Sequence, residues 1–508
     1  MSCFKCGLCE NKYSTTCFIT IKDVFLQKHI FKNHFFKNHF LKMEFVDRIK
    51  EQKRLQRAFG SNKRKFVVVY GRRRLGKSTL LKRVITEDDI YFEAARQETQ
   101  VQISLLATTI ADRYEGFDMP VYPSWHSILT AFNKVCRENT VLVLDEFPYM
   151  VEKDSALPSV LQTLVDSGEL RYHLVVCGSS QRMMQRFVLD KSDPLYGRAH
   201  ERMNLRPIRP QYWQEVMRLD AVSTIEEYSV WGGVPRYWAL REEYGSFCEA
   251  VEELVLDEHG MLNGEPSALF VDEASDIAPF QSIMTAIGHG NTRYSAVASA
   301  IGKKTTEISK PLSALVEMSY ICKDVPFGES EEKTKKTLYV INDNFMAFYY
   351  TFIEPHRSML ALGRTAFVMQ KIRAGFPAHV GKVWEQLCQT AVSGNELFGH
   401  TWNMARRWWG KVPVYEDGRK TPVGFDDLEF DVVAEAVDAK DTILVGECKW
   451  KAADYADRLL VQLKAKAEKA PFAQGKKIVY VLFLKEPPLS AADCHVFLPD
   501  DVLKYQPE

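Results

Sequence analysis

The chain has 508 residues, of which 46% are hydrophobic and 26% are charged, and its 66 Lys and Arg residues balance 66 Asp and Glu residues. This length predicts roughly three or four domains, and the composition excludes a mostly disordered, collagenous or disulfide-scaffold protein. The formal net charge of zero excludes a uniformly basic nucleic-acid coat but not a local basic face.

Residues 1–42 differ in character from the rest of the chain. The pentapeptide Phe-Lys-Asn-His-Phe occurs at 31–35 and again at 36–40, and four of the eleven cysteines are clustered upstream of it. These cysteines and three histidines are potential metal ligands, although their spacing matches no standard pattern: Cys3, Cys6, Cys9, Cys17, His29, His34 and His39. We weigh a small metal site against a disordered or spurious leader, expect the leader, and start the first domain at Met43.

The remaining cysteines are scattered singly through the chain. This usage is typical of a reducing compartment, so we expect a cytoplasmic protein. The apolar runs at 66–70, 141–144 and 478–484 are far shorter than the roughly 20 residues that a membrane helix needs. Each run fits a buried strand, and we expect no membrane partner.

Short apolar stretches alternate with helical ones from residue 43 to 210. The pattern predicts strands at 66–70, 89–92, 141–144 and 173–177, and helices at 77–85, 123–135 and 157–166. Alternation of this kind predicts a parallel sheet with helices on both faces. We therefore expect an α/β fold for this part of the chain.

A glycine-rich segment follows the first predicted strand directly. It fits the pattern G-x-x-x-x-G-K-[ST] of a phosphate-binding loop, with Gly71, Arg72, Arg73, Arg74, Leu75, Gly76, Lys77 and Ser78. The glycines allow a tight turn whose N–H groups point at a β-phosphate, and the next helix aims its positive end at the same anion. We expect Lys77 to contact the β- and γ-phosphates of ATP, Ser78 to bind Mg²⁺, and Thr79 to complete the site.

Two further strand ends carry polar residues. The third predicted strand ends in Asp145 and Glu146; we expect Asp145 to hold Mg²⁺ and Glu146 to orient or deprotonate the attacking water. Ser179, after the fourth strand, is a candidate sensor of the γ-phosphate, although serine is also a common turn residue. Arg198 is a candidate arginine finger, and a solvated or DNA-positioning arginine is the alternative.

Six segments occur in an order that resembles a known family. They are Phe45-Val46-Asp47-Arg48, the phosphate-binding loop, Leu144-Asp145-Glu146-Phe147-Pro148-Tyr149-Met150, Cys177-Gly178-Ser179-Ser180, Pro194-Leu195-Tyr196-Gly197-Arg198 and Gly232-Gly233-Val234-Pro235-Arg236-Tyr237. Together they resemble prokaryotic and archaeal ATPases of the AAA+/STAND kind, many of which carry a C-terminal PD-(D/E)XK nuclease-like fold. The resemblance covers residues 43–508. It implies that Lys77, Ser78, Asp145 and Glu146 bind and hydrolyse ATP and that Pro235 lies near the nucleotide base.

Residues 211–275 are helical and read as a lid, and residues 276–355 have the outline of a winged helix. The pattern predicts helices at 279–287, 295–301 and 305–318 and a hairpin of strands at 320–325 and 337–341. Six lysines favour contact with DNA phosphates: Lys303, Lys304, Lys310, Lys333, Lys335 and Lys336. Three glutamates in the wing argue against such contact, and a rigid lever without DNA is the alternative.

Residues 367–508 return to an α/β pattern, with a helix at 380–392 and strands at 429–435 and 442–448. Glu447 and Lys449 share one face of a strand, beside Asp431 if the two strands form a hairpin. Asp431 and Glu447 can hold Mg²⁺, and Lys449 can orient water for phosphodiester attack. This arrangement resembles PD-(D/E)XK nucleases, in which Glu385 and Gln462 match further positions. Arg406, Arg407, Trp408 and Trp409 offer a basic, aromatic edge that could contact nucleic acid; the alternative is that the two tryptophans are simply core and strand edge.

The sequence thus predicts an ATPase of the P-loop class, coupled through a winged helix to a small restriction-endonuclease-like domain that cuts DNA with Mg²⁺. The resemblance suggests a role in defence or mobile-element maintenance. DNA and further copies of the same chain are the candidate macromolecular partners. Two alternatives stay open: an ATP-driven STAND switch with a non-cutting C-terminal module, and a DNA-binding regulator timed by its nucleotide.

Overall fold

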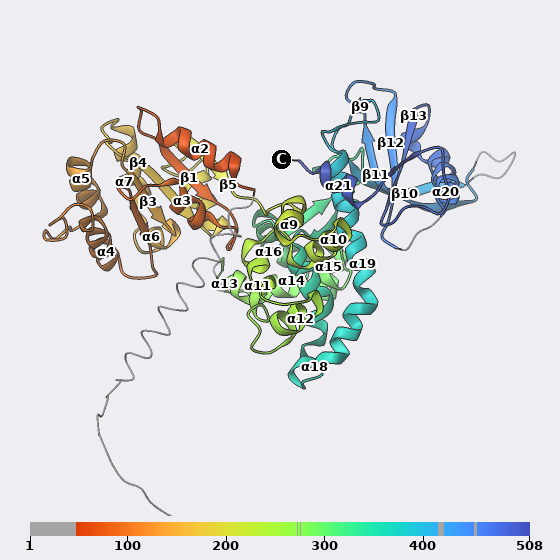
Figure 1. Cartoon of the computed structure of the whole chain (residues 1–508), viewed down its shortest axis with the longest axis horizontal. Helices are drawn as coiled ribbons and strands as arrows, with labels where there is room; N and C mark the ends of the chain where they lie inside the picture. The colour runs from red at the N-terminus through yellow and green to blue at the C-terminus, as the bar shows by residue number, and fades with distance from the viewer. Residues whose placement is uncertain (1–46, 272, 275, 415–420, 452–454, 508) are drawn as a thin grey trace, which may run out of the picture. The chain divides into compact units, whose positions relative to one another are not determined.

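The computed structural model describes residues 47–271, 273–274, 276–414, 421–451 and 455–507 (Figure 1). The candidate metal ligands within residues 1–42 and the expected domain start at Met43 lie outside the described residues. Within the described part, seven cysteines are free thiols, and no helix combines the length and the apolar character that crossing a membrane requires.

A five-stranded parallel sheet forms the first α/β part, as the alternating pattern predicts. Its strands are β1 (Phe66–Tyr70), β2 (Ile90–Glu93), β3 (Val141–Asp145), β4 (His173–Gly178) and β5 (Glu201–Asn204), in the order β2-β3-β4-β1-β5. The central strands are buried and apolar because helices cover the sheet. The fifth strand was not predicted, since its sequence, Glu-Arg-Met-Asn, has no apolar run and it lies at an edge.

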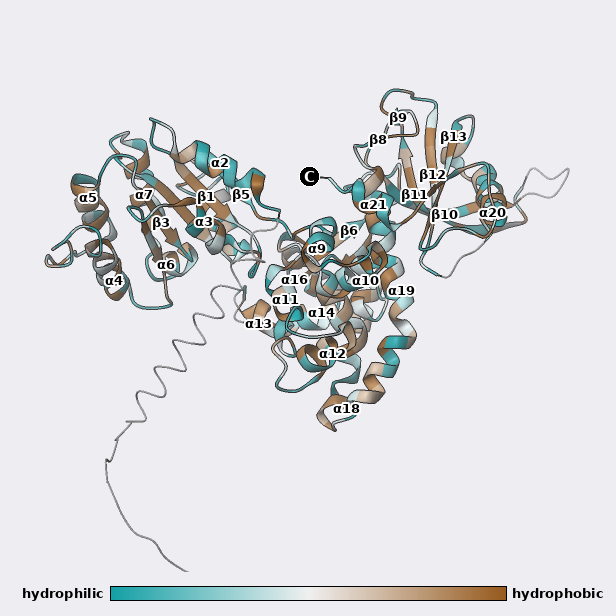
Figure 2. Cartoon of the chain, in the orientation of Figure 1, coloured by the Kyte–Doolittle hydropathy of each residue, from teal (hydrophilic) through white to brown (hydrophobic). Residues whose placement is uncertain are grey.

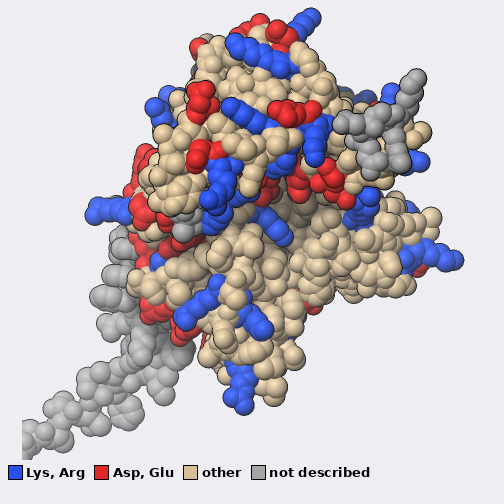
Figure 3. Space-filling view, turned by 90° about the vertical axis from the view of Figure 1, so that its right-hand side faces the viewer, with Lys and Arg blue, Asp and Glu red and all other residues tan. Residues whose placement is uncertain are grey.

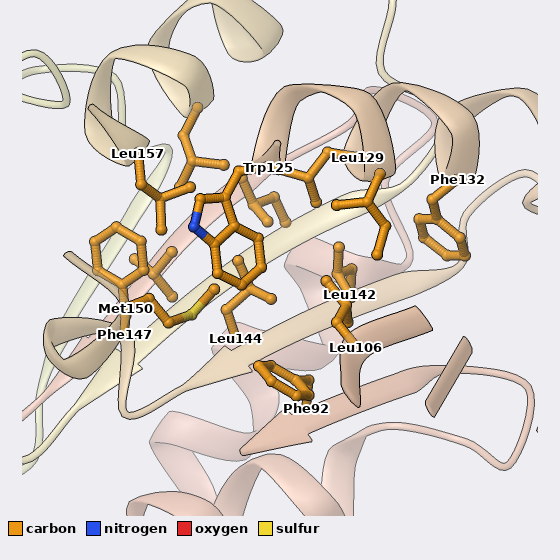
Figure 4. Packing of buried hydrophobic residues seen from close by; sticks show 14 of the residues in the cluster. Phe92, Leu106, Trp125, Leu129, Phe132, Leu142, Leu144, Phe147, Met150 and Leu157 are labelled. Atoms are coloured by element: carbon orange, nitrogen blue, oxygen red, sulfur yellow. The ribbon is translucent and has the colours of Figure 1, made fainter. Parts of the chain in front are cut away.

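Among the described residues, six helices belong to the same α/β part of the chain as this sheet. They are α2 (Ile49–Phe59), α3 (Lys77–Val84), α4 (Thr99–Ala111), α5 (Trp125–Val135), α6 (Phe147–Lys153) and α7 (Leu157–Asp166). Ser124 caps α5 by accepting a hydrogen bond from the Ser127 backbone. Trp125, Leu129 and Phe132 on this helix then pack over Leu142 and Leu144 of β3 (Figure 4).

The middle of the chain is mainly helical. Its first elements are α8 (Gln181–Met184), η1 (Gln185–Leu189), α9 (Pro210–Met217), α10 (Ala221–Trp231), α11 (Pro235–Arg241), α12 (Phe247–Val251), η2 (Glu252–Leu256) and α13 (Glu265–Val271). The next are α14 (Ala278–Gly288), α15 (Tyr294–Ala300), α16 (Thr305–Glu317), β6 (Ile321–Asp324) and β7 (Leu338–Ile341). These three helices and the antiparallel hairpin agree with the sequence to within two residues at each boundary.

Short helical turns then lead into a long helix. They are α17 (Asn344–Phe348), η3 (Tyr349–Ile353), η4 (Glu354–His356) and α18 (Arg357–Ala361), followed by the 28-residue α19 (Thr365–Val392). The sequence predicts only the second half of α19, because Pro377 and Gly375 interrupt the helical pattern before residue 380.

The C-terminal α/β domain contains a mixed five-stranded sheet. Its elements are β8 (Glu396–Leu397), β9 (His400–Thr401), β10 (Arg406–Val414), β11 (Gly424–Glu435), β12 (Thr442–Lys449), α20 (Ala456–Lys469), η5 (Pro471–Ala473), β13 (Lys477–Leu484), β14 (His495–Phe497) and α21 (Pro499–Lys504). The order β10-β11-β12-β13-β14 is antiparallel up to β12 and parallel after it. One face packs on α19 and the other on α20, so the strands are hydrophobic on both sides (Figure 2).

A buried histidine joins α19 to α10. Nε2 of His379 donates a hydrogen bond to the Ser229 carbonyl oxygen at 2.8 Å. Burial lowers the pKa of His379 to about 4, although this bond opposes the effect. The unfolded chain takes up a proton near pH 6.5 while the folded chain does not, so the residue destabilises the fold as the pH falls.

We expect the free energy of unfolding to drop by about 2 kcal/mol between pH 7 and pH 5 from His379 alone. Urea unfolding at the two pH values measures this drop. His379→Gln, which keeps a hydrogen-bond donor but cannot be charged, is expected to lose that part of the pH dependence. His126→Gln on the exposed side of α5 is the matched control. An equal pH dependence in all three proteins would contradict the assignment.

Candidate functional site

The phosphate-binding loop lies at the carboxyl end of β1, between that strand and α3. Gly71 has a φ of 144° and a Cβ there would meet the Leu205 carbonyl oxygen at 2.6 Å, so no larger residue fits. Gly76 immediately precedes α3 and has the left-handed conformation, with a φ of 81°. These two positions need glycine for the reason the sequence pattern predicts.

Lys77 is buried at the base of this loop. Its Nζ donates a hydrogen bond to the Arg72 carbonyl oxygen at 2.9 Å. Burial lowers its pKa, while the negative charges of Glu146 and Asp145 act in the opposite direction. A bound anion would stabilise this desolvated ammonium group, which is the property a triphosphate site requires.

Ser78 and Asp145 meet across the carboxyl ends of β1 and β3. The Ser78 hydroxyl donates to Oδ2 of Asp145 at 2.6 Å, and the Tyr91 hydroxyl on β2 donates to the same oxygen. Burial raises the pKa of Asp145, but hydrogen bonds from Cys177, Ser78 and Tyr91 outweigh it and leave the pKa below its usual value. The structure therefore brings together a hydroxyl and a charged carboxylate, which are suitable ligands for Mg²⁺. Tyr91 was missed because a tyrosine inside a short strand carries no site signal.

Glu146 and Ser179 also form a pair beside the loop. Glu146 precedes α6 in a left-handed conformation with a φ of 51°. Ser179 donates to its carboxylate twice, from the hydroxyl at 2.7 Å and from the backbone N–H at 3.2 Å. The serine thus contacts the acid that the sequence assigns to water activation.

We expect Glu146→Gln to retain ATP binding and to slow hydrolysis by about 10²–10⁴-fold. Glutamine keeps one oxygen to accept the hydrogen bond from the Ser179 N–H, and its NH2 group can donate to the Ser179 hydroxyl, but it cannot take a proton from water. Phosphate release and nucleotide affinity, measured side by side, check this expectation. Glu152→Gln, at an exposed position of α6, should change neither quantity. Unchanged turnover in Glu146→Gln would move water activation to another residue.

Arg198 lies near the amino ends of the strands, whereas the phosphate-binding loop lies at their carboxyl ends. It precedes β5, which runs parallel to β1 with Glu201 beside Val67, whereas the loop follows the carboxyl end of β1. Its guanidinium forms two hydrogen bonds of 2.8 Å to the Asp166 carboxylate. The fold therefore does not bring Arg198 to the loop of its own chain.

Pro235 begins α11, and the preceding Gly233 packs tightly against the Ile208 backbone.

Two arginine side chains of the loop point to carboxylates in the middle of the chain. Arg72 forms a buried 2.7 Å ion pair with Asp343, next to β7, and stacks 4.5 Å from the centre of the Tyr320 ring, next to β6. Arg74 pairs with Glu265 of α13 at 2.6 Å. The side chains of Arg72 and Arg74 therefore bind carboxylates of the protein.

The other end of the β6–β7 hairpin contacts the C-terminal domain. Arg407 of β10 pairs with Asp324 of β6 at 3.3 Å, and its carbonyl oxygen accepts a 2.9 Å hydrogen bond from the Phe327 backbone. Arg406 pairs with Glu331 at 2.8 Å. Trp408 is buried on this strand. The strand-edge interpretation of this arginine and tryptophan segment therefore holds in the structure.

The C-terminal acidic residues come together on β11 and β12. Oδ2 of Asp431 accepts a 2.8 Å hydrogen bond from the Cys448 backbone, which places the two strands in the predicted hairpin register. Lys449 Nζ lies 2.6 Å from Oε1 of Glu447. Burial and the charge of Glu447 raise the pKa of Asp431 to about 6, and burial and the charge of Asp431 raise the pKa of Glu385 on α19 to about 7.

Burial acts on Glu447 in the same direction, but the hydrogen bonds that Lys449 and Lys466 donate outweigh burial and leave the pKa of Glu447 below its usual value. Within the described residues, no group of three or more His, Cys, Asp and Glu side chains is arranged to hold a metal ion by itself. Mg²⁺ usually takes one or two carboxylates and keeps waters or substrate oxygens as its other ligands. Asp431 and Glu447 fit that smaller requirement.

A second lysine was missed by the sequence analysis. Gln462 is exposed on α20, whereas Lys466, one helical turn further on, lies 2.6 Å from Oε2 of Glu447. Gln462 and Lys466 are four residues apart and therefore neighbours on the surface of α20, and this spacing is the only sequence feature that links the predicted residue to the observed one. The amphipathic pattern of α20 does not say which polar residue faces the strands.

Comparisons with known proteins bear on the part of the chain that contains the phosphate-binding loop. Residues 45–238 match the model of an ATPase domain predominantly from Archaea, and residues 349–463 match a family of archaeal and bacterial proteins of unknown function. An uncharacterized protein of Methanocaldococcus jannaschii is 27% identical over 421 residues, which are 82% of this chain and 89% of that protein.

Two solved structures are also similar. A Walker-type ATPase of Pyrococcus abyssi has a TM-score of 0.47 and 19% identity, covering 60% of this chain and 96% of that one. The ORC2 protein of Aeropyrum pernix, in ADPNP–ADP complexes, has a TM-score of 0.40 and 13% identity, covering 65% of this chain and 95% of that one. From the family match and the loop geometry, residues 45–238 are similar to a P-loop ATPase domain.

Proposed function

We propose that the chain is an ATPase coupled through a winged helix to a Mg²⁺-dependent, DNA-directed nuclease site. ATP and Mg²⁺ bind at residues 71–79 and Asp145, and Glu146 activates the attacking water. The observation that carries the ATPase part is the meeting of Ser78 with Asp145 at 2.6 Å beside the buried Lys77. In this proposal, residues 43–210, 211–275, 276–355 and 367–508 are the ATPase core, lid, winged helix and nuclease-like domain.

The winged-helix assignment is supported by an additional strand contact. Arg293, between α14 and α15, forms an isolated antiparallel bridge with Leu338 of β7. This bridge ties the segment between the two helices to the β6–β7 hairpin, so the helices α14, α15 and α16 and the hairpin form one unit. Lys303, Lys304 and Lys310 are exposed around the start of α16, where DNA phosphates can be contacted.

The ion pairs of the wing favour a role as a rigid lever over a role in binding DNA. Glu331 pairs with Arg406, and Lys336 pairs with Glu329 at 2.7 Å. The face of the molecule in Figure 3 carries acidic and basic side chains interspersed, without a uniformly basic area. Lys336 is therefore paired within the wing, whereas Lys333, Lys335 and the three lysines around the start of α16 are exposed and are the candidates for DNA contact.

Coupling between the two sites is supported by the contacts of the hairpin. At its base, Asp343 and Tyr320 hold Arg72 of the phosphate-binding loop. Further along, Asp324 contacts Arg407, which also pairs with Glu429 two residues before Asp431. A shift of the loop on nucleotide binding is thereby transmitted through one rigid hairpin to the strand that carries the acidic site.

The proposal is tested by incubating the full chain with plasmid DNA and Mg²⁺, with and without ATP. Cutting that depends on ATP supports it. Absence of cutting, together with ATP-dependent growth in particle mass, would support the STAND switch instead; in that case Arg198 could contact the nucleotide of a neighbouring copy. DNA binding without cutting, with a salt dependence that reports several phosphate contacts, would support the regulator.

A further inference from the structure

The Glu447 carboxylate is held between two lysines. Lys449 on β12 contacts Oε1 and Lys466 on α20 contacts Oε2, each at 2.6 Å. The Glu447 side chain is only 13% exposed. Both oxygens of this carboxylate therefore carry a cationic partner, one from the strand and one from the helix that covers it.

Lys466 is fixed more firmly than an ordinary surface lysine. Its Nζ also donates to the Glu429 carbonyl oxygen at 3.2 Å and lies 5.5 Å from the centre of the Phe430 ring. Lys469, one turn away on the same helix, pairs with Asp426 while both side chains are about half exposed. Exposed pairs of that kind contribute little, whereas Lys466 is held by three groups around the acidic site.

The charges at this site limit what it can bind. Asp431 and Glu447 contribute two negative charges, and Lys449 and Lys466 contribute two positive ones. One divalent cation that binds Asp431 and one oxygen of Glu447 has to displace the lysine at that oxygen, and a second cation would have to displace the other lysine as well. Repulsion between like charges at such short range is strong in a partly buried site.

We propose that Lys466 is a positioning residue that orients the Glu447 carboxylate and restricts the acidic site to a single divalent cation. This inference rests on the metal site in the proposed function. It predicts opposite effects on two measurements, because removing Lys466 takes away a repulsive charge and also frees the carboxylate to rotate.

The test is Mn²⁺ binding to the full chain without nucleotide, measured by titration calorimetry and Mn²⁺ paramagnetic resonance, beside plasmid cutting. The wild type is expected to bind one Mn²⁺ that Asp431→Asn does not bind. Lys466→Met is expected to bind Mn²⁺ about tenfold more tightly and to cut about 10–100-fold more slowly. Lys466→Arg keeps the charge and should keep the wild-type Mn²⁺ affinity.

Lys469→Met is the matched control on the same helix and should change neither quantity; circular dichroism verifies that each variant is folded. Unchanged or weaker Mn²⁺ binding in Lys466→Met, or two ions in the wild type that are both lost in Asp431→Asn, would overturn the inference. A tighter Mn²⁺ site in a chain that never cuts DNA would support Lys466 while rejecting the nuclease. A wild type that binds no Mn²⁺ at Asp431 would reject both.

Discussion

Lys77→Ala is expected to weaken ATP binding by about 10²–10⁴-fold. The ammonium group is placed to form charge-assisted hydrogen bonds to two phosphate oxygens, each of which contributes about 1.5–3 kcal/mol, and every 1.4 kcal/mol is tenfold in affinity. Hydrolysis should be lost with binding, because the γ-phosphate is then no longer held beside Glu146.

The same substitution is not expected to unfold the chain. Burial lowers the pKa of Lys77, which means that the folded protein bears a cost for this charge when no anion is bound. Removing the charge removes that cost, and the methyl group of alanine is compatible with the first turn of α3. Thermal unfolding without nucleotide should therefore occur at or above the wild-type temperature.

Thermal unfolding with and without ATP measures both effects together. A ligand at 100 times its Kd stabilises the folded state by about 2.7 kcal/mol, so ATP should raise the unfolding temperature of the wild type and leave that of Lys77→Ala unchanged. Lys53→Ala, on an exposed position of the neighbouring α2, should respond like the wild type. Retained ATP affinity in Lys77→Ala would reject the phosphate-binding role of the loop.

The fold was predictable where one local pattern decides the structure. The parallel sheet follows from the apolar runs of β1, β3 and β4, because these strands are buried on both faces. The loop follows from Gly71 and Gly76, because the turn needs positive φ angles at both positions. The edge strand β5 and the first half of α19 were not predictable, since tertiary packing overrides weak or interrupted local signals there.

Some residues of the two candidate sites were predictable from the sequence and others were not. Ser78 with Asp145, and Asp431 with Glu447, follow from strand ends and strand register, which sequence spacing encodes. The partners of Arg72 and Lys466 do not, because each lies on a different element whose orientation depends on packing. Asp343 is 271 residues from Arg72 in sequence. Arg198 lies near the amino end of β5, away from the loop, although its sequence context resembles that of an arginine finger.

Asp431→Asn is expected to reduce DNA cutting by about 10³-fold or more. A metal ion contributes several kcal/mol of charge stabilisation in the transition state, and 1.36 kcal/mol corresponds to a factor of ten. Asparagine has nearly the same shape and keeps an oxygen to accept the hydrogen bond from the Cys448 backbone. The substitution therefore removes the charge and leaves the strand pairing intact.

Stability separates this role from a structural one. Burial and the charge of Glu447 raise the pKa of Asp431 to about 6, so at neutral pH the folded chain holds a carboxylate that the unfolded chain ionises more readily. Removing that charge should make Asp431→Asn at least as stable as the wild type while cutting is lost. Plasmid cutting and thermal unfolding measured on the same samples check the pair of expectations, with Asp427→Asn on the exposed side of β11 as the control. If Asp431→Asn still cuts DNA, the phosphodiester chemistry takes place elsewhere. If it loses both cutting and stability, Asp431 has a structural role and not a catalytic one.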